Sequence, residues 1–416
     1  MNNTKKRLLE NFISLGALQV VSYTLPLITL PYLSRTLTSE KFGLVFYAIT
    51  CMTYFMILTD YGFELSATRE IAVNRHNLNT LSNIFNSVTV IKLFLLIISY
   101  FILCVTTFTI PKFRENWLIF HLSFFMVIGN AIYPVWFFQG LEKMKYITFL
   151  NILSKIIFLL LIFVFVKQES DYILVPLLNS LGFLISGIIG FAFAIKKFNI
   201  RLYIPRFKSL KKQFTYSNDF FLSKISVQAF STTNTFCLGL ISSNVIVAYY
   251  IAAEKLYTAI KNLVIPINSA LYPFVAKNKD IKTYKKIYTI VIILGSFITL
   301  FVFVFAKDIV TLFYGKELLG AYQILRLFCL SLLVTFPSII LGYPLLGGMG
   351  YTKEANLSII IGALIHIVGL VILFALKLLN PYSMALMVFL TESIILIARS
   401  YYVRKYKLLK QEEIQK

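Results

Sequence analysis

The sequence predicts an all-α integral membrane protein, with twelve transmembrane helices in two parallel six-helix bundles around a central cavity. Three observations predict this fold. The 416 residues are 58% hydrophobic and only 14% charged, with a mean hydropathy of +0.79, whereas a soluble domain carries about 25% charge. Twelve windows are long and apolar enough to cross a bilayer. Weak self-similarity then divides these windows into two sets of six.

The twelve predicted spans follow one another with short connections. A helix needs about 20 apolar residues to cross the hydrocarbon core. The spans are 12–33, 42–62, 84–108, 117–139, 147–166, 172–195, 217–240, 245–266, 286–306, 322–346, 355–376 and 381–403. Prolines interrupt the first, fourth and tenth spans. They are tolerated because neighbouring helices can bond the carbonyl groups that proline leaves free.

An internal repeat relates the fourth span to the tenth and the first to the seventh. Residues that match at an offset of 210 or 209 are Tyr133 and Tyr343, Pro134 and Pro344, Gly140 and Gly350, Lys143 and Lys353, Gln19 and Gln228, and Ser22 and Ser231. Six spans in each half give both halves the same orientation, as in transporters built of parallel repeats. The alternative is chance similarity among apolar helices. The repeat predicts an N-terminal bundle at 1–195, a basic linker at 196–213 and a C-terminal bundle at 214–416.

Lysine and arginine in the connections predict the orientation. With a cytoplasmic N-terminus, 25 of the 40 Lys and Arg residues lie in inside segments and 8 in outside loops. We therefore expect both termini in the cytoplasm, and the basic loops 196–213 and 267–286 against anionic lipid headgroups. This distribution also argues that the net charge of +22 serves membrane topology rather than nucleic-acid binding.

Charged residues inside the spans are the candidate functional residues. A charge that faces lipid at the bilayer centre costs about 2.5–3.5 kcal/mol, so these groups are expected to face a polar interior or to snorkel to an interface. In the seventh span, four polar residues are spaced by 4, 3 and 4 and share one helix face: Lys224, Gln228, Ser231 and Thr235. The sequence favours a hydrated cavity over the alternative, polar contacts that only hold helices together.

The predicted site residues fall into three groups. The cations expected to bind substrate are Lys224, Lys255, Arg326 and Lys155. The other polar residues expected in the cavity are Gln19, Gln228, Ser231 and Thr235. The acids that could couple transport to an ion are Asp219, Glu254 and Asp60. Three further predictions concern packing: Lys92 snorkels, Glu392 pairs with Arg399 on one face, and His366 is a hydrogen-bonded core histidine.

Other classes of function are disfavoured by missing motifs. The chain has no phosphate-binding loop, so it is not expected to hydrolyse nucleotide. Its four cysteines lie in apolar runs without a CxxC pair, and its three histidines are scattered, which predicts neither disulfides nor a metal site. The outside loops are short, and this argues against an enzyme with an outer-face active site. No cofactor is expected.

Motifs in the first four spans resemble a known family. The first span runs PLITLPYLSR from Pro26 to Arg35, the second ends in DYGF from Asp60, and the fourth closes with WFFQGLE from Trp136. These segments resemble the Wzx-type O-antigen flippases, in the polysaccharide transporter branch of the multidrug/oligosaccharidyl-lipid/polysaccharide exporter superfamily. The similarity is sharpest over residues 11–145 and does not identify the sugar.

The resemblance implies that undecaprenyl-diphosphate-linked repeat units are moved from the inner to the outer leaflet of a bacterial plasma membrane by alternating access. It implies membrane lipid, a coupling ion (proton or sodium), and polymerase and chain-length proteins of the same pathway as partners. The alternative is a drug/cation antiporter of the same superfamily. Cations inside the spans outnumber acids 7 to 4, and this favours an anionic cargo.

Overall fold

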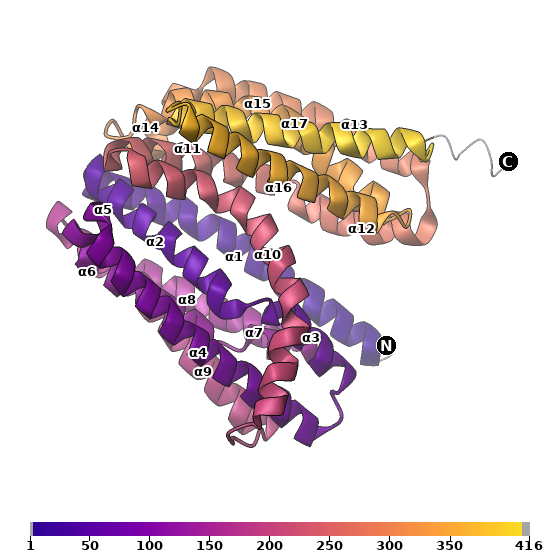
Figure 1. Ribbon diagram of the computed structural model, residues 1–416. Helices are drawn as coiled ribbons and strands as arrows, with labels where there is room; N and C mark the ends of the chain where they lie inside the picture. The colour runs from indigo at the N-terminus through magenta and orange to yellow at the C-terminus, as the bar shows by residue number, and fades with distance from the viewer. Residues whose placement is uncertain (1–2, 410–416) are drawn as a thin grey trace. The chain divides into compact units, whose positions relative to one another are not determined.

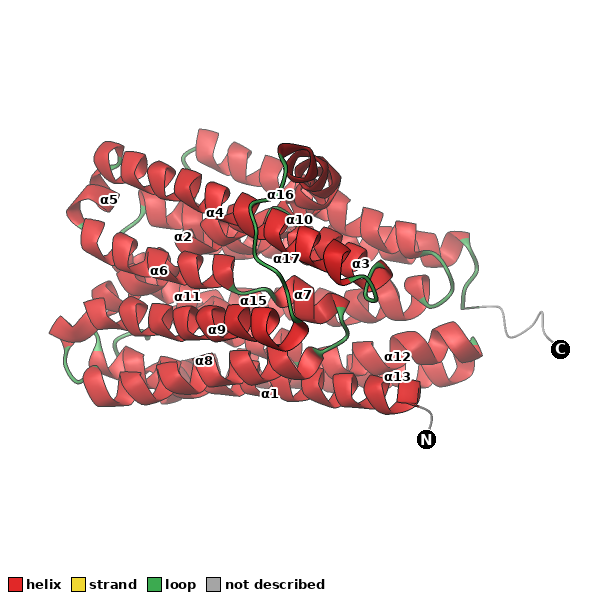
Figure 2. Ribbon diagram, turned by 90° about the horizontal axis from the view of Figure 1, so that it is seen from below, coloured by secondary structure: helices red, strands yellow, loops and turns green. Residues whose placement is uncertain are grey.

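The computed structural model describes the backbone of residues 3–409, and the side chains in this range except those of 3–15, 17, 20, 23 and 222–231. Within this range the chain forms helices and no strand (Figure 2). Its contacts divide it into two compact units, residues 1–225 and 226–416, which we call the N-terminal and C-terminal units. The division falls inside one long helix, α10.

The helices of the N-terminal unit are coloured indigo to magenta in Figure 1. Their bounds are α1 Asn3–Thr36, α2 Ser39–Asp60, α3 Phe63–Val73, α4 Leu78–Thr109, α5 Pro111–Glu115, α6 Trp117–Ile132, α7 Val135–Gly140, α8 Met144–Phe165, the 3₁₀ helix η1 Glu169–Ile173, and α9 Leu174–Phe198. Helix α10, Phe207–Ile241, begins in this unit. Helices α2, α4 and α6 pack against one another along their lengths (Figure 1).

The C-terminal unit continues from α10. Its bounds are α11 Asn244–Asn262, α12 Ile265–Asn278, α13 Ile281–Val304, α14 Ala306–Tyr314, α15 Ala321–Ile340, the π-helical segment η2 Leu341–Gly347, α16 Thr352–Ala375 and α17 Pro381–Lys405. Helix α17 packs against both α15 and α16.

Nine membrane spans stand out among the described residues by length and apolar composition. They correspond to nine of the predicted spans, and they establish an all-α, multi-pass membrane protein. The remaining three predicted spans are helical and lie in α1, α10 and α11, but these helices are not among the nine. Helices α1 and α10 include residues outside the described side chains, and α11 carries the charged residues Glu254, Lys255 and Lys261. The count of twelve stays a prediction.

The two units repeat one plan of packing. In each unit a short helix follows the second long helix and packs on the broken end of the fourth: α3 on α7, and α12 on η2. The fourth long helix contacts the second, third and sixth in both units. Both breaks fall at the Tyr-Pro pairs, after Ile132 and after Ile340. This shared order supports the internal repeat over chance similarity.

Glycines bring α6 and α9 into backbone contact in the N-terminal unit. A Cβ added to Gly129 would lie 2.4 Å from the carbonyl carbon of Phe183, and one added to Gly187 would lie 2.5 Å from the carbonyl oxygen of Gly129. A Cβ added to Gly182 would lie 2.7 Å from the hydroxyl and 2.8 Å from the carbonyl oxygen of Ser154 on α8. Small residues permit such approach between membrane helices. The three helices therefore form a tight wall, which we call the glycine seam.

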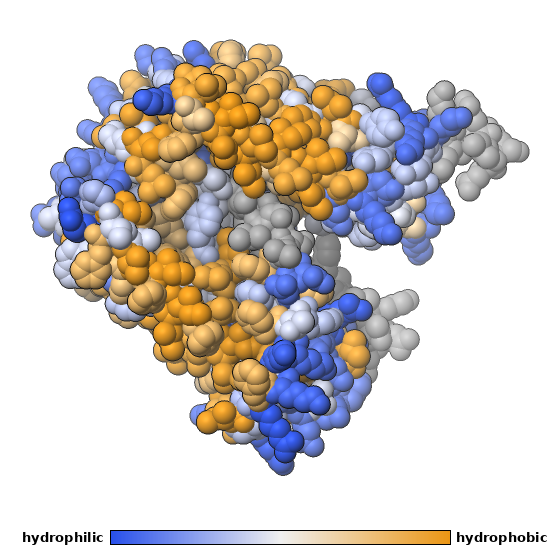
Figure 3. Space-filling model, in the orientation of Figure 1, coloured by the Kyte–Doolittle hydropathy of each residue, from blue (hydrophilic) through white to orange (hydrophobic). Residues whose placement is uncertain are grey.

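The surface of each unit agrees with burial in lipid. Apolar side chains cover the middle of the helices, and polar side chains gather toward their ends (Figure 3). Phe94, Ile97 and Phe101 on α4 are 62%, 70% and 68% exposed. Such an apolar surface is stable only against lipid or another apolar partner.

Candidate functional site

The N-terminal unit encloses a pocket of about 350 Å³ between α1, α2, α6, α7, α8 and α9. Its polar lining consists of three amides, four hydroxyls and one ammonium: Asn130, Asn151, Asn179, Thr29, Tyr133, Ser154, Ser186 and Lys155. Among the described residues around it, Lys155 is the only one charged at neutral pH. We call this cavity the Lys155 pocket.

Four polar side chains in the Lys155 pocket have no partner among the residues that the structure describes. Asn130, Ser154, Lys155 and Asn179 are half-buried, and none makes a side-chain hydrogen bond or ion pair to a described residue. Asn151 is anchored instead, because it donates to the Ile147 carbonyl at 2.9 Å and to the Tyr133 hydroxyl at 3.3 Å. Half-buried polar groups need water or a ligand to satisfy them, so the pocket is suited to a polar guest.

A buried ion pair lies near this pocket. Lys92 of α4 is 3% exposed, and its Nζ lies 3.9 Å from Asp60 and 3.5 Å from the Asn130 carbonyl oxygen. That carbonyl is four residues before Pro134, which has no N–H to bond it. The prediction that Lys92 snorkels is wrong, because an acid and a freed carbonyl hold it inside the bundle.

The C-terminal unit contains a second set of polar groups, and these are paired. Lys261 of α11 contacts Glu392 of α17 at 2.7 Å, and Tyr257 contacts Thr335 at 3.5 Å. The side chain of Glu392 is 6% exposed. Arg399 does not take Glu392 as its hydrogen-bond partner, so the predicted Glu392–Arg399 pair is wrong. Glu392 bonds Lys261 of α11 and Arg399 bonds Ser338 of α15, although their spacing of seven places them on one face of α17.

Arg399 stabilises the break in the tenth span. Its guanidinium donates to the carbonyl and hydroxyl of Ser338, at 2.6 and 3.1 Å, and to the hydroxyl of Ser358 at 3.1 Å. The neighbouring Gly342 is non-helical, with ψ −116°, and a Cβ added to it would lie 2.8 Å from the guanidinium carbon. Tyr284 donates to the Ile340 carbonyl at 3.1 Å, which Pro344 leaves without its helical donor.

His366 is a hydrogen-bonded core residue, as predicted. Its Nδ1 lies 2.8 Å from the Thr391 hydroxyl, and its Nε2 lies 3.0 Å from the amide oxygen of Asn234. On the same helix as Asn234, Thr235 is buried and donates to Glu254 at 3.3 Å. Two of the residues predicted from the sequence, Thr235 and Glu254, are therefore in contact.

The remaining predicted residues are spread over the units. Arg326 donates from Nε to the Phe303 carbonyl at 3.1 Å and lies over two aromatic rings. Lys255 and Asp219 are exposed, and Gln19 is half-buried. The side chains of Lys224, Gln228 and Ser231 lie outside the described residues. The sequence did not single out Asn130, Asn151 and Asn179, although amides inside apolar spans are a signal that could have revealed them.

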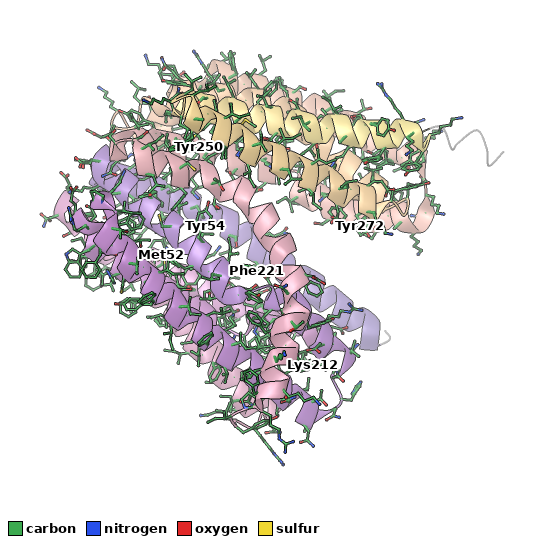
Figure 4. The ribbon with its side chains drawn as sticks, in the orientation of Figure 1. Met52, Tyr54, Lys212, Phe221, Tyr250 and Tyr272 are labelled. Atoms are coloured by element: carbon green, nitrogen blue, oxygen red, sulfur yellow. The ribbon has the colours of Figure 1, made fainter. Side chains whose placement is uncertain are left out.

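The first turns of α10 belong to the N-terminal unit. Phe214 and Phe221 stack on Tyr61, with ring centroids 4.3 and 4.5 Å apart. Lys212 lies 3.9 Å from Glu70, which also accepts a hydrogen bond from Gln213. Figure 4 shows Lys212 and Phe221 on this part of the helix. In the C-terminal unit, Tyr272 packs edge-on to Tyr343 at the break.

Metal chemistry has no evident place in the described part of the chain. Among these residues, no group of three His, Cys, Asp or Glu side chains could hold a metal ion.

Comparison with known proteins identifies the family. The model of the polysaccharide biosynthesis protein family matches residues 8–279. A protein of Escherichia coli K12, named as a candidate O-antigen transporter, is 29% identical over 98% of this chain and 100% of its own length. One of Shigella dysenteriae with the same name is 28% identical over 94% of this chain and 98% of its own.

Solved structures share the fold. A lipid II flippase, MurJ, in an inward closed conformation aligns with TM-score 0.71 and 15% identity, over 97% of this chain and 89% of its own. An inward-facing multidrug resistance transporter of the MATE family, in the MOP superfamily, aligns with TM-score 0.67 and 15% identity, over 96% and 99%.

These comparisons confirm the predicted resemblance to the flippases of the polysaccharide transporter branch. They also agree with a transporter rather than an enzyme, because the relatives carry transporter names. With 8–279 matched by the family model, the chain belongs to the polysaccharide biosynthesis protein family.

Proposed function

We propose that this protein translocates undecaprenyl-diphosphate-linked polysaccharide repeat units from the inner to the outer leaflet of the bacterial plasma membrane by alternating access. The observation that carries the proposal is the Lys155 pocket, where unpartnered amides and an ammonium lie inside a bundle of membrane helices. A sugar–diphosphate headgroup needs such polar groups on its route, because crossing lipid unaided would strip its hydration. The family and the names of the two relatives support the same cargo class.

In this proposal, cationic side chains bind the diphosphate. Lys224, Lys255, Arg326 and Lys155 are the proposed contacts, since charge-assisted hydrogen bonds to phosphate are strong at low dielectric. Gln19, Gln228, Ser231 and Thr235 would meet sugar hydroxyls. Asp219, Glu254 and Asp60 are the proposed acids for coupling to a proton or sodium ion. The proposed architecture is twelve spans, in bundles at 1–195 and 214–416 that a linker at 196–213 joins.

The linker supports the proposed orientation, with both termini in the cytoplasm. Asn86 of α4 bonds the backbone of Arg201 and Tyr203, at 2.8 and 3.3 Å, and so fixes the segment that follows α9. Beyond it, Ile204 and Phe207 are 91% and 78% exposed. Apolar side chains among basic ones suit the headgroup region of the anionic cytoplasmic leaflet. A Ser209→Cys variant should react with an impermeant thiol reagent only after the cell membrane is opened.

Reconstitution tests the function. Purified protein in liposomes should expose an undecaprenyl-diphosphate-linked oligosaccharide to an external glycosidase faster than protein-free liposomes do. The Lys224→Ala/Arg326→Ala variant should lose most of this rate at equal protein content, whereas Lys307→Gln, at an exposed lysine, should keep it. Equal rates with and without wild-type protein would refute the proposal. Export of a cationic dye by the same liposomes would instead favour the antiporter alternative.

A further inference from the structure

We propose that the Lys155 pocket binds an oxyanion-bearing, hydroxyl-rich group of the transported lipid, with Lys155 on the oxyanion and the amides of Asn130 and Asn179 on hydroxyls. This inference rests on the proposed function and deepens it. The oxyanion has two possible sources with the same chemistry: the carboxylate of an acidic sugar, or the diphosphate beside the first sugar.

The first support is that several hydrogen-bonding side chains of the pocket have no partner among the described residues. Asn130, Ser154 and Asn179 have no side-chain partner among the described residues. An amide offers both a donor and an acceptor, and a hydroxyl does the same. A ligand rich in hydroxyl groups matches this set, because each hydroxyl can donate to one such group and accept from another.

The second support is the charge. Lys155 is half-buried, and no carboxylate of a described residue lies within ion-pair distance of it. Among the described lining residues none is acidic. The ammonium of Lys155 would repel a free metal or organic cation here. An anion would supply the missing counter-charge, and its hydrogen bond to Lys155 would be charge-assisted.

The third support is the shape of the pocket. Phe158 of α8 and Phe183 of α9 contribute aromatic side chains to a lining that also carries the polar groups. Aromatic surface is suited to the apolar faces of sugar rings. The volume of about 350 Å³ lies within the usual range for small-ligand pockets. The glycine seam holds α6, α8 and α9 in backbone contact, so the pocket keeps its shape without a ligand.

The test measures binding to the full chain in nanodiscs with three probes. They are undecaprenyl diphosphate alone, the same lipid carrying a neutral hexose, and the same lipid carrying a uronic acid. The variants are Lys155→Gln, Lys155→Arg and the matched control Lys307→Gln. Losing a charge-assisted hydrogen bond should weaken binding about tenfold to a hundredfold in Lys155→Gln. Lys155→Arg and Lys307→Gln should stay near wild type.

The probes distinguish the two sources of the anion. A loss confined to the uronic acid probe assigns Lys155 to a sugar carboxylate, and an equal loss with all three assigns it to the diphosphate. Unchanged binding of all three probes by Lys155→Gln overturns the inference while the proposed function stands. Failure of wild-type protein to bind any probe counts against the proposed function itself.

A second variant keeps the test decisive if Lys155→Gln misfolds. Asn179→Asp places a carboxylate in a pocket that has none among its described lining residues. It should weaken binding of the same probe or probes that Lys155→Gln affects at least tenfold, without altering the thermal unfolding midpoint by more than a few degrees. Unimpaired binding by a folded Asn179→Asp protein would contradict an anion in this pocket.

Discussion

The two units share a plan of packing but differ in how their polar interiors are satisfied. In the C-terminal unit, Lys261, Arg399 and His366 each have close partners, at 2.6–3.1 Å. In the N-terminal unit the ion pair of Lys92 and Asp60 is looser, at 3.9 Å, and Lys155 has no partner among the described residues. Buried polar networks rigidify a structure when every member is satisfied.

This difference teaches that repeated architecture does not imply repeated roles. In the C-terminal unit, Arg399 stabilises a break in a helix through its bonds to Ser338. The groups of the N-terminal unit that have no partner among the described residues surround a pocket, where we propose that they bind a ligand. The following changes are ordered from the largest expected effect to the smallest, and each tests one side of the comparison.

The largest effect is expected from Glu392→Ala in the C-terminal unit. It leaves Lys261 without its partner, and breaking a buried ion pair costs about 3–5 kcal/mol. We expect the lower end of that range, because the Lys261 side chain is 27% exposed. The thermal unfolding midpoint in detergent measures it. A Lys261→Met/Glu392→Leu variant removes both charges and should recover most of the loss. If Glu392→Ala unfolds like wild type, this network is not structural.

A smaller effect is expected from Gly129→Ala in the N-terminal unit. The new Cβ meets backbone atoms of Phe183 at 2.4 Å, so α6 and α9 must separate, and overpacking of this kind costs about 1–3 kcal/mol. The pocket beside the seam should also bind its ligand less well. Gly16→Ala is the control, since no described atom outside its own turn of helix lies within 4 Å of a Cβ added there. Equal stability of the two variants would show that the seam can relax.

The hydroxyl of Tyr284, which bonds the Ile340 carbonyl, can be tested against a matched tyrosine on the same helix. Tyr284→Phe removes the hydroxyl that bonds the Ile340 carbonyl, and it should cost about 1 kcal/mol. Tyr288→Phe on the same helix is the matched control, because its hydroxyl bonds no described residue. Chemical unfolding of both variants measures the difference. An effect of the same size in both would mean that the carbonyl finds another donor.

The smallest expected effect is a difference in pH dependence between the N-caps of α13 and α4, the third long helices of the two units. Asp280 caps α13, where the hydroxyl and backbone N–H of Thr283 bond its carboxylate at 2.6 and 3.0 Å and lower its pKa. A lowered pKa gives stabilisation that is present at neutral pH and lost as pH falls below about 4. Asn77 caps α4 in the N-terminal unit and does not titrate.

The measurement compares Asp280→Ala and Asn77→Ala with wild type from pH 7 to pH 3. The deficit of Asp280→Ala should shrink as the pH falls, whereas that of Asn77→Ala should stay constant. A constant deficit for both variants would show that the charge of Asp280 contributes nothing to the cap.

Much of the fold could be predicted because apolar length determines it. Every predicted span lies for most of its length in one long helix, although α10 begins at Phe207, ten residues before the predicted start, because its first turns are polar. The short helices α3 and α12 gave no such signal. Partners such as Asp60 for Lys92 come from separate helices, and spacing along one helix cannot reveal them.

The candidate site was predictable only in part, for the same reason. A lysine in an apolar span is conspicuous, and Lys155 does line a pocket. The neutral amides around it have no charge to mark them, and their convergence depends on how α6, α8 and α9 pack. Conversely, Arg326 is as conspicuous as Lys155, yet it bonds the carbonyl of Phe303.

The backbone contact between Gly129 and Gly187 lets the packing of α6 against α9 and the choice of ligand depend on different residues. The helices approach there through residues that have no side chains, while Phe158 and Asn179, which line the pocket, take no part in that contact. Relatives that handle chemically different saccharides could therefore diverge at the latter positions and keep the former, and so acquire new cargo without rebuilding the bundle.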